Sequence, residues 1–312
     1  MNNDTVPLPE PRSNRPITIA HRIEYALICG LFIFFRIIGV DAASAIAGKT
    51  MRIFGPLIRP VSKRGEDNLK MIFPDWPQSK IKSVMRDVWE NVGRTGGEYA
   101  HLDKFSTSGA DSRIELVVRD KSVAALQSAG RGVFVTGHFA NWEISGIAAH
   151  QQGQKFAFVY RAQNNPLLDA WLIKTRASVM TRRQIPKGLA GARPMIDALK
   201  DDYSLAFLAD QKLNTGGILV PFMGQPAMTA PAAARIAVRF KLPVIPGVIE
   251  RIDGANFRAI SFDPIEYEIT GDLVADVEAL TTSINDFLET QIRERPAQWL
   301  WLHRRWHIKS SS

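Results

Sequence analysis

A histidine and a glutamate five residues apart, His138 and Glu143, have the types and the spacing of an acid–base pair. Residues 133–135 form an apolar, β-favouring run, and Gly137 can adopt the dihedral angles that a sharp turn needs. Asn141 is a good cap for a helix predicted over 142–149. His138 is therefore expected in the turn between a buried strand and a helix. Because a turn separates the two residues, we expect the Glu143 carboxylate to fold back to one imidazole nitrogen. That contact would fix the tautomer and make the other nitrogen a base for a hydroxyl group.

The same two residues allow a second interpretation. His138 would then be a core histidine, and Glu143 would only complement the dipole at the start of a helix. A short motif leaves both interpretations open, so the remaining chain has to decide between them.

Apolar strand-like runs alternate with helix-like segments over most of the chain. This alternation is typical of an α/β fold, and we predict an αβα sandwich with a mostly parallel central sheet. A further helix with apolar residues at helical spacing is expected from residue 79 to about residue 92. The predicted strands are 114–118, 133–136, 156–160, 205–209, 244–250 and 257–262, and the predicted helices are 123–129, 142–149, 166–179, 189–199 and 231–240.

Polar residues follow two other predicted strands directly. Arg161 comes after the strand 156–160, and Asp210 and Gln211 come after the strand 205–209. Ligands of open α/β sheets bind at the carboxyl ends of the strands, so these positions are candidates for a substrate site together with His138.

Positive charge is concentrated near the middle of the sequence. The chain has 39 Lys and Arg against 31 Asp and Glu, and residues 155–193 hold eight basic side chains but only one acidic one, Asp169. Many of these residues can belong to solvated helix faces. Arg161 and Arg176, however, flank a helix that is predicted to begin at Asn165, where an arginine can bind a phosphate or stabilise an oxyanion.

Composition restricts the remaining possibilities. Of the 312 residues, 46% are hydrophobic, which suffices for a substantial core, and the net charge of +8 favours a polyanionic partner. Cys29 is the single cysteine, so an internal disulfide and a cysteine-built metal site are excluded.

The first 60 residues suggest attachment to a membrane. Residues 1–20, with four prolines, are predicted to be a mobile tail, and residues 25–35 are apolar and uncharged. This run is too short to span, since about 20 apolar residues are needed and Arg36 follows it. We expect an interfacial helical anchor over 21–60. A tilted span, a signal peptide and a helix buried in the fold are the alternatives.

Three of the seven tryptophans fall within eight residues near the C-terminal end, between Trp299 and Trp306. Trp299 and Trp301 are expected to pack in the core, although an aromatic belt at a lipid interface is also compatible with them. Arg304 and Arg305 are expected to face anionic lipid or protein.

Together these residues resemble the late acyltransferases of lipid A biosynthesis, the lauroyl/myristoyl transferase family within the wider group of acyltransferases with a His-x-x-x-x-Asp/Glu motif. The resemblance covers nearly the whole chain from the apolar N-terminal run onward. Its five motifs occur in the family's order. They are Asn68-Leu69 with Phe73-Pro74, the segment 137–143, Tyr160-Arg161 with the segment 165–169, Asp210-Gln211 with the segment 220–224, and the segment 301–305.

The resemblance implies transfer of a fatty acyl chain from acyl carrier protein onto a hydroxyl of a hydroxyacyl chain of a lipid A precursor. It places this reaction at the cytoplasmic face of the inner membrane, with residues 61–312 as the acyltransferase domain and with no cofactor or metal. His138 and Glu143 match the catalytic pair and Arg176 the functional arginine. The residues assigned to substrate binding are Asn141, Arg161, Asn165, Asp210 and Gln211.

Two departures and two alternatives accompany this assignment. Ala140 stands where glycine is common in the family, and the segment 295–298 lacks the usual glutamate beside its glutamine. The same chemistry would serve an acyltransferase for a glycerophospholipid or another glycolipid. A non-enzymatic basic protein that binds membrane or nucleic acid is the more distant alternative, and no helix-turn-helix, zinc-finger or RNP-like signature supports nucleic acid as a partner.

Overall fold

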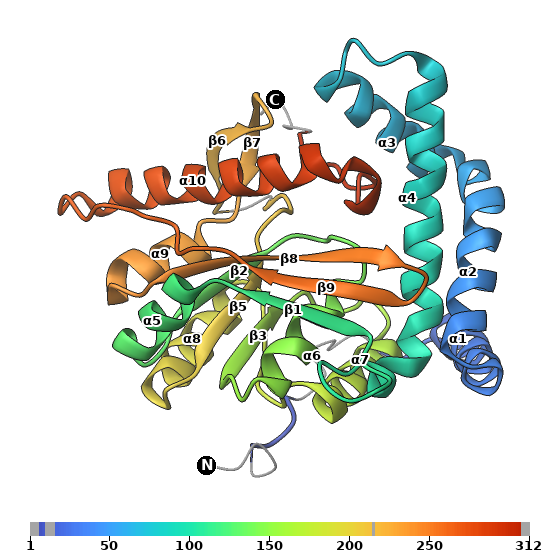
Figure 1. Cartoon of the computed structure of the whole chain (residues 1–312), viewed down its shortest axis with the longest axis horizontal. Coiled ribbons are helices and arrows are strands. Elements are labelled where there is room, and N and C mark those ends of the chain that lie inside the picture. Colours follow the sequence, from blue (N-terminus) through green and yellow to red (C-terminus); the bar gives the residue numbers. More distant parts are fainter. Residues whose placement is uncertain (1–5, 10–15, 214–215, 307–312) are drawn as a thin grey trace.

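A central sheet of seven strands organises the protein (Figure 1). The computed structural model describes residues 6–9, 16–213 and 216–306. Five neighbouring strands run parallel, and the edge pair β9 and β1 runs in the opposite direction. The mostly parallel α/β fold predicted from the sequence is thus confirmed. In spatial order the strands are β1 (Ile114–Val118), β9 (Asn256–Ser261), β8 (Val244–Asp253), β2 (Val133–Thr136), β5 (Ser204–Leu208), β3 (Phe156–Tyr160) and β4 (Gln184–Pro186).

Helices cover both faces of the sheet and form two separate hydrophobic cores with it. Alternate residues of each strand point to opposite faces, so Val133 and Val135 enter one core while Phe158 and Tyr160 enter the other. The larger core is covered by α8 (Leu189–Lys200), α9 (Ala232–Phe240) and α10 (Leu273–Glu294), and the smaller one by α6 (Glu143–Gln151) and α7 (Pro166–Val179). Helix α5 (Asp120–Ala129) lies beside α6 across a cavity.

The six predicted strands and the predicted helices are confirmed with shifts of a few residues at their ends. The short strand β4 and the long helix α10 are not among the predictions. Strand β4 escapes prediction because it has only three residues, one of them a proline at its end. Helix α10 mixes buried apolar positions with buried polar ones such as Asp276 and Asn285, which weakens the apolar periodicity.

The N-terminal part of the chain is helical and packs along one side of the sheet domain, at the right in Figure 1. Helix α1 contacts Asp103 of the same helical part through an ion pair with Arg36, and it contacts the sheet domain through Phe32, whose ring packs edge-on with Trp171. The elements of this part are α1 (Ile19–Ile38), α2 (Val40–Phe54), η2 (Gly55–Leu57), α3 (Arg59–Ile72), α4 (Gln78–Glu98) and η3 (Tyr99–Lys104).

None of the described helices has both the length and the apolarity needed to cross a membrane. Helix α1 is capped by Thr18, and its outward face carries exposed apolar side chains. The predicted mobile tail lies partly outside the described residues, since 1–5 and 10–15 are not described. The exposed apolar residues of α1 are Ile19, Ile23, Leu27, Leu31, Ile33, Phe34 and Ile37.

The C-terminal segment lies between the carboxyl ends of the parallel strands and a hairpin of strands β6 (Ile218–Phe222) and β7 (Gln225–Thr229). After η4 (Pro296–Gln298), Trp299 and Trp301 are buried, which confirms core packing for both. The prediction that Arg305 faces lipid or protein is wrong. Its side chain is only 1% exposed and donates hydrogen bonds to the Met228 carbonyl (3.0 Å) and the Thr229 hydroxyl (2.8 Å).

Helix α4 approaches helix α2 closely because glycines face it. A Cβ atom added at Gly93 would stand 2.3 Å from the Ala47 carbonyl oxygen, so the backbones of α2 and α4 would have to separate. We expect Gly93→Ala to lower the free energy of unfolding by about 1–3 kcal/mol, measured by urea denaturation.

Gly96, one turn away on the same helix, is the matched control. A Cβ atom there meets nothing within 4 Å, so Gly96→Ala should raise the free energy of unfolding by about 0.5–1 kcal/mol through helix propensity. Equal effects of the two substitutions would contradict the close helix contact.

Candidate active site

His138 lies in the turn between strand β2 and helix α6, as the sequence predicts. Two features of the local sequence shape this turn. Gly137 has no room for a side chain, since a Cβ atom would lie 2.7 Å from the Phe139 ring and 3.2 Å from Asp210 Oδ2. Ala140 adopts a positive φ of 45°, a left-handed conformation that explains why glycine is common at this position in the family that the sequence resembles.

The carboxylate bonded to the His138 ring belongs to Asp210. His138 Nδ1 lies 2.7 Å from Asp210 Oδ1, and the other carboxylate oxygen accepts the His138 backbone N–H and the Trp299 indole N–H, each at 2.8 Å. No hydrogen bond joins His138 to Glu143 in the described part of the chain, so the predicted contact between these two was wrong. The turn carries Glu143 into helix α6, whose first residue it is, and the carboxylate points to a different partner.

Asp210 stays ionised in its buried position. Burial alone would raise its pKa, but the charge of His138 and the hydrogen bonds from its ring and backbone bring the pKa of Asp210 well below its usual range. An ionised Asp210 accepts a hydrogen bond from the protonated Nδ1 of His138. In this tautomer the other ring nitrogen, Nε2, carries a lone pair. The pair thus has the geometry of a general base held in the correct tautomer.

Gln211 lies between His138 and a second histidine, His303. Its amide nitrogen is 3.0 Å from His138 Nε2 but also only 3.5 Å from Nδ1, so it lies over the ring and not along the Nε2 lone pair. The same nitrogen is 2.8 Å from His303 Nε2. Burial, followed by the charge of His138, lowers the pKa of His303 to about 4, which keeps this ring neutral and able to accept the amide N–H.

Glu143 forms a second buried pair with Arg176. Arg176 Nε and Nη2 lie 2.9 and 2.5 Å from the two carboxylate oxygens, and the Tyr99 hydroxyl donates to Glu143 Oε1 at 2.6 Å. Burial raises the pKa of Glu143, but the charge of Arg176 and the hydrogen bonds outweigh it and the pKa is lowered overall. Two of the three guanidinium nitrogens are therefore engaged inside the protein, which does not fit a phosphate ligand.

The structure distributes the predicted substrate-binding residues differently. Asp210 and Asn141 are predicted to touch substrate, but both are fully buried and hold other residues. Asn165 caps helix α7 by accepting the Leu167 N–H (3.0 Å) and also donates to Glu24 of α1 (2.9 Å), so both ends of its side-chain amide contact other residues of the protein. Arg161 is exposed at the end of β3, and Gln211 is half-buried against His138.

An apolar cavity of about 390 Å³ lies between the sheet and helices α5 and α6. It begins beside the site, because Thr136 precedes the catalytic turn and Gly146 lies in the first turn of α6. Its other walls are formed by Phe134, Phe156, Phe158 and Ala149, and it reaches Gln152 at the far end of α6. A cavity of this size and lining suits a small apolar ligand.

Comparison with known proteins identifies the chain. Residues 14–308 match the model of a family described as bacterial lipid A biosynthesis acyltransferase. The chain belongs to this family. This acyltransferase is similar to the lipid A biosynthesis lauroyltransferase of Escherichia coli (strain K12), with 26% identity over 78% of each chain. It is also similar to the lipid A biosynthesis acyltransferase of Haemophilus influenzae, with 24% identity over 78% of this chain and 76% of the relative, and to the E. coli myristoyltransferase, with 21% identity over 82% and 78%.

The acyltransferase contains site residues to which the sequence assigns no such role. Asp210 as the partner of His138, Trp299 as its second donor and Tyr99 as a partner of Glu143 all come from distant parts of the chain. For Asp210 a signal exists: it lies two residues after the end of β5, the strand that pairs with β2, and the carboxyl ends of both strands meet at one edge of the sheet. For Tyr99 and Trp299 the sequence carries no comparable signal.

The His138–Asp210 pair predicts the effect of one substitution. Asp210→Asn keeps the shape of the side chain but favours the wrong imidazole tautomer, so acyl transfer by the purified enzyme should fall by about 10³ to 10⁴. Asp201→Asn, at an exposed carboxylate, is the control and should leave the rate unchanged. If Asp210→Asn keeps the rate within tenfold of the parent, with circular dichroism showing a folded protein, the assignment of the base is wrong.

Proposed function

We propose that this acyltransferase transfers a fatty acyl chain from the thioester of acyl carrier protein to a hydroxyl of a hydroxyacyl chain of a lipid A precursor, in lipopolysaccharide biosynthesis. The observation that carries the proposal is the buried His138–Asp210 pair at the mouth of β2. Membership of the lipid A acyltransferase family supports the lipid A precursor as the acceptor.

The proposed reaction needs only groups that the site supplies. His138 Nε2 takes the proton of the acceptor hydroxyl, and the oxygen attacks the thioester carbonyl to form a tetrahedral intermediate. The carbon–sulfur bond then breaks, and the imidazolium returns its proton to the leaving thiolate, giving the new ester and the free thiol. Asp210 stabilises the imidazolium meanwhile. We assign the oxyanion to Arg176, whose Nη1 lies outside the two-point contact with Glu143.

The apolar cavity beside α6 is the proposed site of the acyl chain. Thr136 and Gly146 line its end nearest the catalytic turn, and phenylalanine side chains of β2 and β3 line its length. An acyl chain placed there would have its thioester end close to the turn and its methyl end towards Gln152. The length of this cavity would then set the preferred chain length.

Cations beside the site support a phosphorylated acceptor and an acidic carrier protein. Lys187 follows strand β4, and its backbone N–H donates to the carbonyl of Tyr160, the residue before Arg161, at 2.7 Å. Burial lowers the pKa of Lys187, the negative charge of Asp210 opposes this shift, and the positive charge of Arg161 adds to it. Lys187 and Arg161 therefore lie beside each other at the ends of the neighbouring parallel strands β4 and β3. We propose Arg161 and Lys187, in place of the engaged Arg176, as the pair that binds a phosphate of the acceptor.

Turnover with defined substrates tests the proposal. The parent protein should transfer acyl groups from acyl carrier protein to a lipid A precursor, and His138→Ala should abolish the transfer because no other described base is aligned with Asp210. The measurement crosses acyl chains of several lengths with lipid A precursors and lysophospholipids and identifies products by mass spectrometry. Transfer to lysophospholipid but to no lipid A precursor would overturn the acceptor assignment and leave the chemistry of His138 standing.

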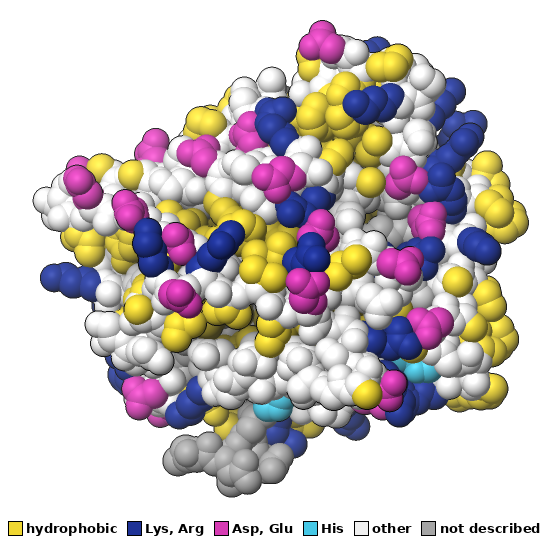
Figure 2. Space-filling model, viewed as in Figure 1, with side chains coloured by type: hydrophobic (Ala, Val, Ile, Leu, Met, Phe, Trp, Pro, Cys, Tyr) yellow, Lys and Arg dark blue, Asp and Glu magenta, His cyan; other side chains and the backbone are white. Residues whose placement is uncertain are grey.

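We further propose that the enzyme binds the cytoplasmic face of the inner membrane through helix α1 and its neighbours. Apolar residues 19, 23, 27, 31, 34 and 37 recur at helical spacing and are exposed, and those of α2 and η2, including Ile53, Phe54 and Leu57, extend the surface. Figure 2 shows hydrophobic side chains with lysines and arginines along the edge where Figure 1 places α1 and α2. Such a surface suits an interfacial helix on anionic lipid.

Vesicle flotation tests this surface. Replacing Leu27 and Leu31 with Glu should lower binding to anionic vesicles at least tenfold, because each buried leucine contributes about 1.5–3 kcal/mol. Leu273→Glu with Val274→Glu alters two exposed apolar residues at the start of α10 and is the control. Equal binding of both variants and the parent would refute the α1 surface.

A further inference from the structure

A buried carboxylate outside the proposed reaction lies behind the catalytic turn. Glu98 is the last residue of α4, and its side chain is 0% exposed. The C-terminal end of a helix carries partial negative charge, so a buried carboxylate is doubly unfavourable there. Its retention at this position requires strong partners.

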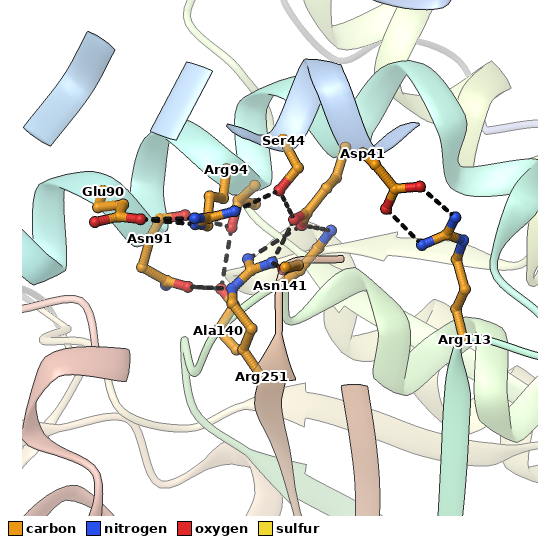
Figure 3. Close-up of polar contacts among 12 residues, drawn as sticks. Asp41, Ser44, Glu90, Asn91, Arg94, Arg113, Ala140, Asn141 and Arg251 are labelled. Carbon is orange, nitrogen blue, oxygen red and sulfur yellow. Dashed lines mark hydrogen bonds and ion pairs between the residues drawn. The ribbon is translucent and has the colours of Figure 1, made fainter. Parts of the chain in front are cut away.

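Three side chains from separate parts of the chain bind Glu98. Arg251 of β8 donates to both carboxylate oxygens, through Nη2 at 3.1 Å and through Nη1. Ser44 of α2 donates its hydroxyl at 2.8 Å, and Asn141 of the catalytic turn donates Nδ2 at 3.0 Å. Figure 3 shows Ser44, Asn141 and Arg251 converging between helix α2 and the turn.

Asn141 connects Glu98 to the start of helix α6. Its side-chain oxygen accepts the backbone N–H of Glu143 at 3.3 Å, so one amide joins Glu98 to the first residue of α6. The neighbouring carbonyl of Ala140 accepts hydrogen bonds from the Asn91 side-chain amide and the Thr95 hydroxyl, each at 3.2 Å.

Arg251 holds the same turn from its other side. Its Nε donates to Asn91 Oδ1 at 3.1 Å, and its backbone N–H and C=O bond the side chain of Gln298. The Gln298 carbonyl in turn accepts the Ala140 backbone N–H at 2.8 Å. The strained residue Ala140 is thus fixed at both backbone groups by a network that includes the Glu98–Arg251 pair.

We propose that Glu98, paired with Arg251, is a positioning residue for catalysis. Acting through Asn141, it sets the conformation of the turn that places His138 and Glu143. The inference rests on the proposed acyl transfer for its kinetic consequence. Misplacement of a catalytic group by about 1 Å can cost about a hundredfold in rate, so a small relaxation of the turn is sufficient to be seen.

Asn141→Ser tests the contact with the least disturbance. A serine hydroxyl can still cap α6 by accepting the Glu143 N–H, but it has no donor that reaches Glu98. We expect kcat for acyl transfer to fall by about ten- to a hundredfold, with KM for donor and acceptor within threefold of the parent. Glu98→Gln combined with Arg251→Met removes the ion pair without leaving one buried charge and should lower kcat in the same way.

Ser44→Ala is the matched control. It removes one hydrogen bond to Glu98 of similar length on the side away from the turn, so we expect a slightly lower melting temperature and a kcat within twofold of the parent. If Ser44→Ala lowers kcat as much as Asn141→Ser does, Glu98 serves general packing and the proposal is overturned.

A signal of His138 itself separates this inference from the proposed function. The imidazole Nδ1 proton, bonded to Asp210, is followed by proton–nitrogen NMR. It should shift or broaden in Asn141→Ser and in the double variant and coincide with the parent in Ser44→Ala. An unchanged signal in both altered proteins overturns the positioning role. A parent protein that transfers no acyl group overturns the proposed function alone, and the His138 signal still decides the role of Glu98.

Discussion

The hydrogen bond between His138 and the buried carboxylate of Asp210 is the interaction on which the site depends. It joins the ends of two neighbouring parallel strands, β2 and β5, and the same carboxylate binds the Trp299 indole from the C-terminal segment. The sheet therefore supplies the geometry. Strand pairing brings the histidine and the aspartate to one edge, and burial makes their contact strong because water does not compete for it.

Three buried carboxylates surround the turn from His138 to Glu143, and each is compensated differently. Asp210 accepts hydrogen bonds from His138 and an indole, Glu143 pairs with Arg176 and accepts from a tyrosine hydroxyl, and Glu98 pairs with Arg251 and accepts from an asparagine and a serine. Removing one partner of a buried ion pair leaves a charge in a poor solvent, which typically costs about 3–5 kcal/mol. The turn is consequently held by buried contacts that water does not replace, which suits a candidate site built on one short loop.

The sequence predicts the sheet and the position of His138 well because both depend on local patterns. Apolar runs such as 133–136 and 156–160 predict buried strands. A polar residue after such a run lies at the carboxyl end of a strand, where ligands of open α/β sheets bind. The hydrogen-bond partners of these residues are not predicted by local patterns. Glu143 is near His138 in the chain, yet Asp210 contacts it, because strand order and not sequence distance decides which carboxylate is adjacent. Asn141 and Asn165 look like ligand-binding amides in the sequence, but only tertiary structure shows that helix caps and buried pairs use them.

The C-terminal segment makes the site late to form during synthesis. Gln298 accepts the Ala140 N–H, the Leu300 N–H binds the His138 carbonyl, and Trp299 binds Asp210. A chain emerging from the ribosome completes all the strands of the sheet before these residues appear, so the turn around His138 lacks three of its anchors until then. An incomplete chain would thus have the sheet without the fully anchored turn, so activity is expected only after the C-terminal segment has been synthesised and has packed against the sheet.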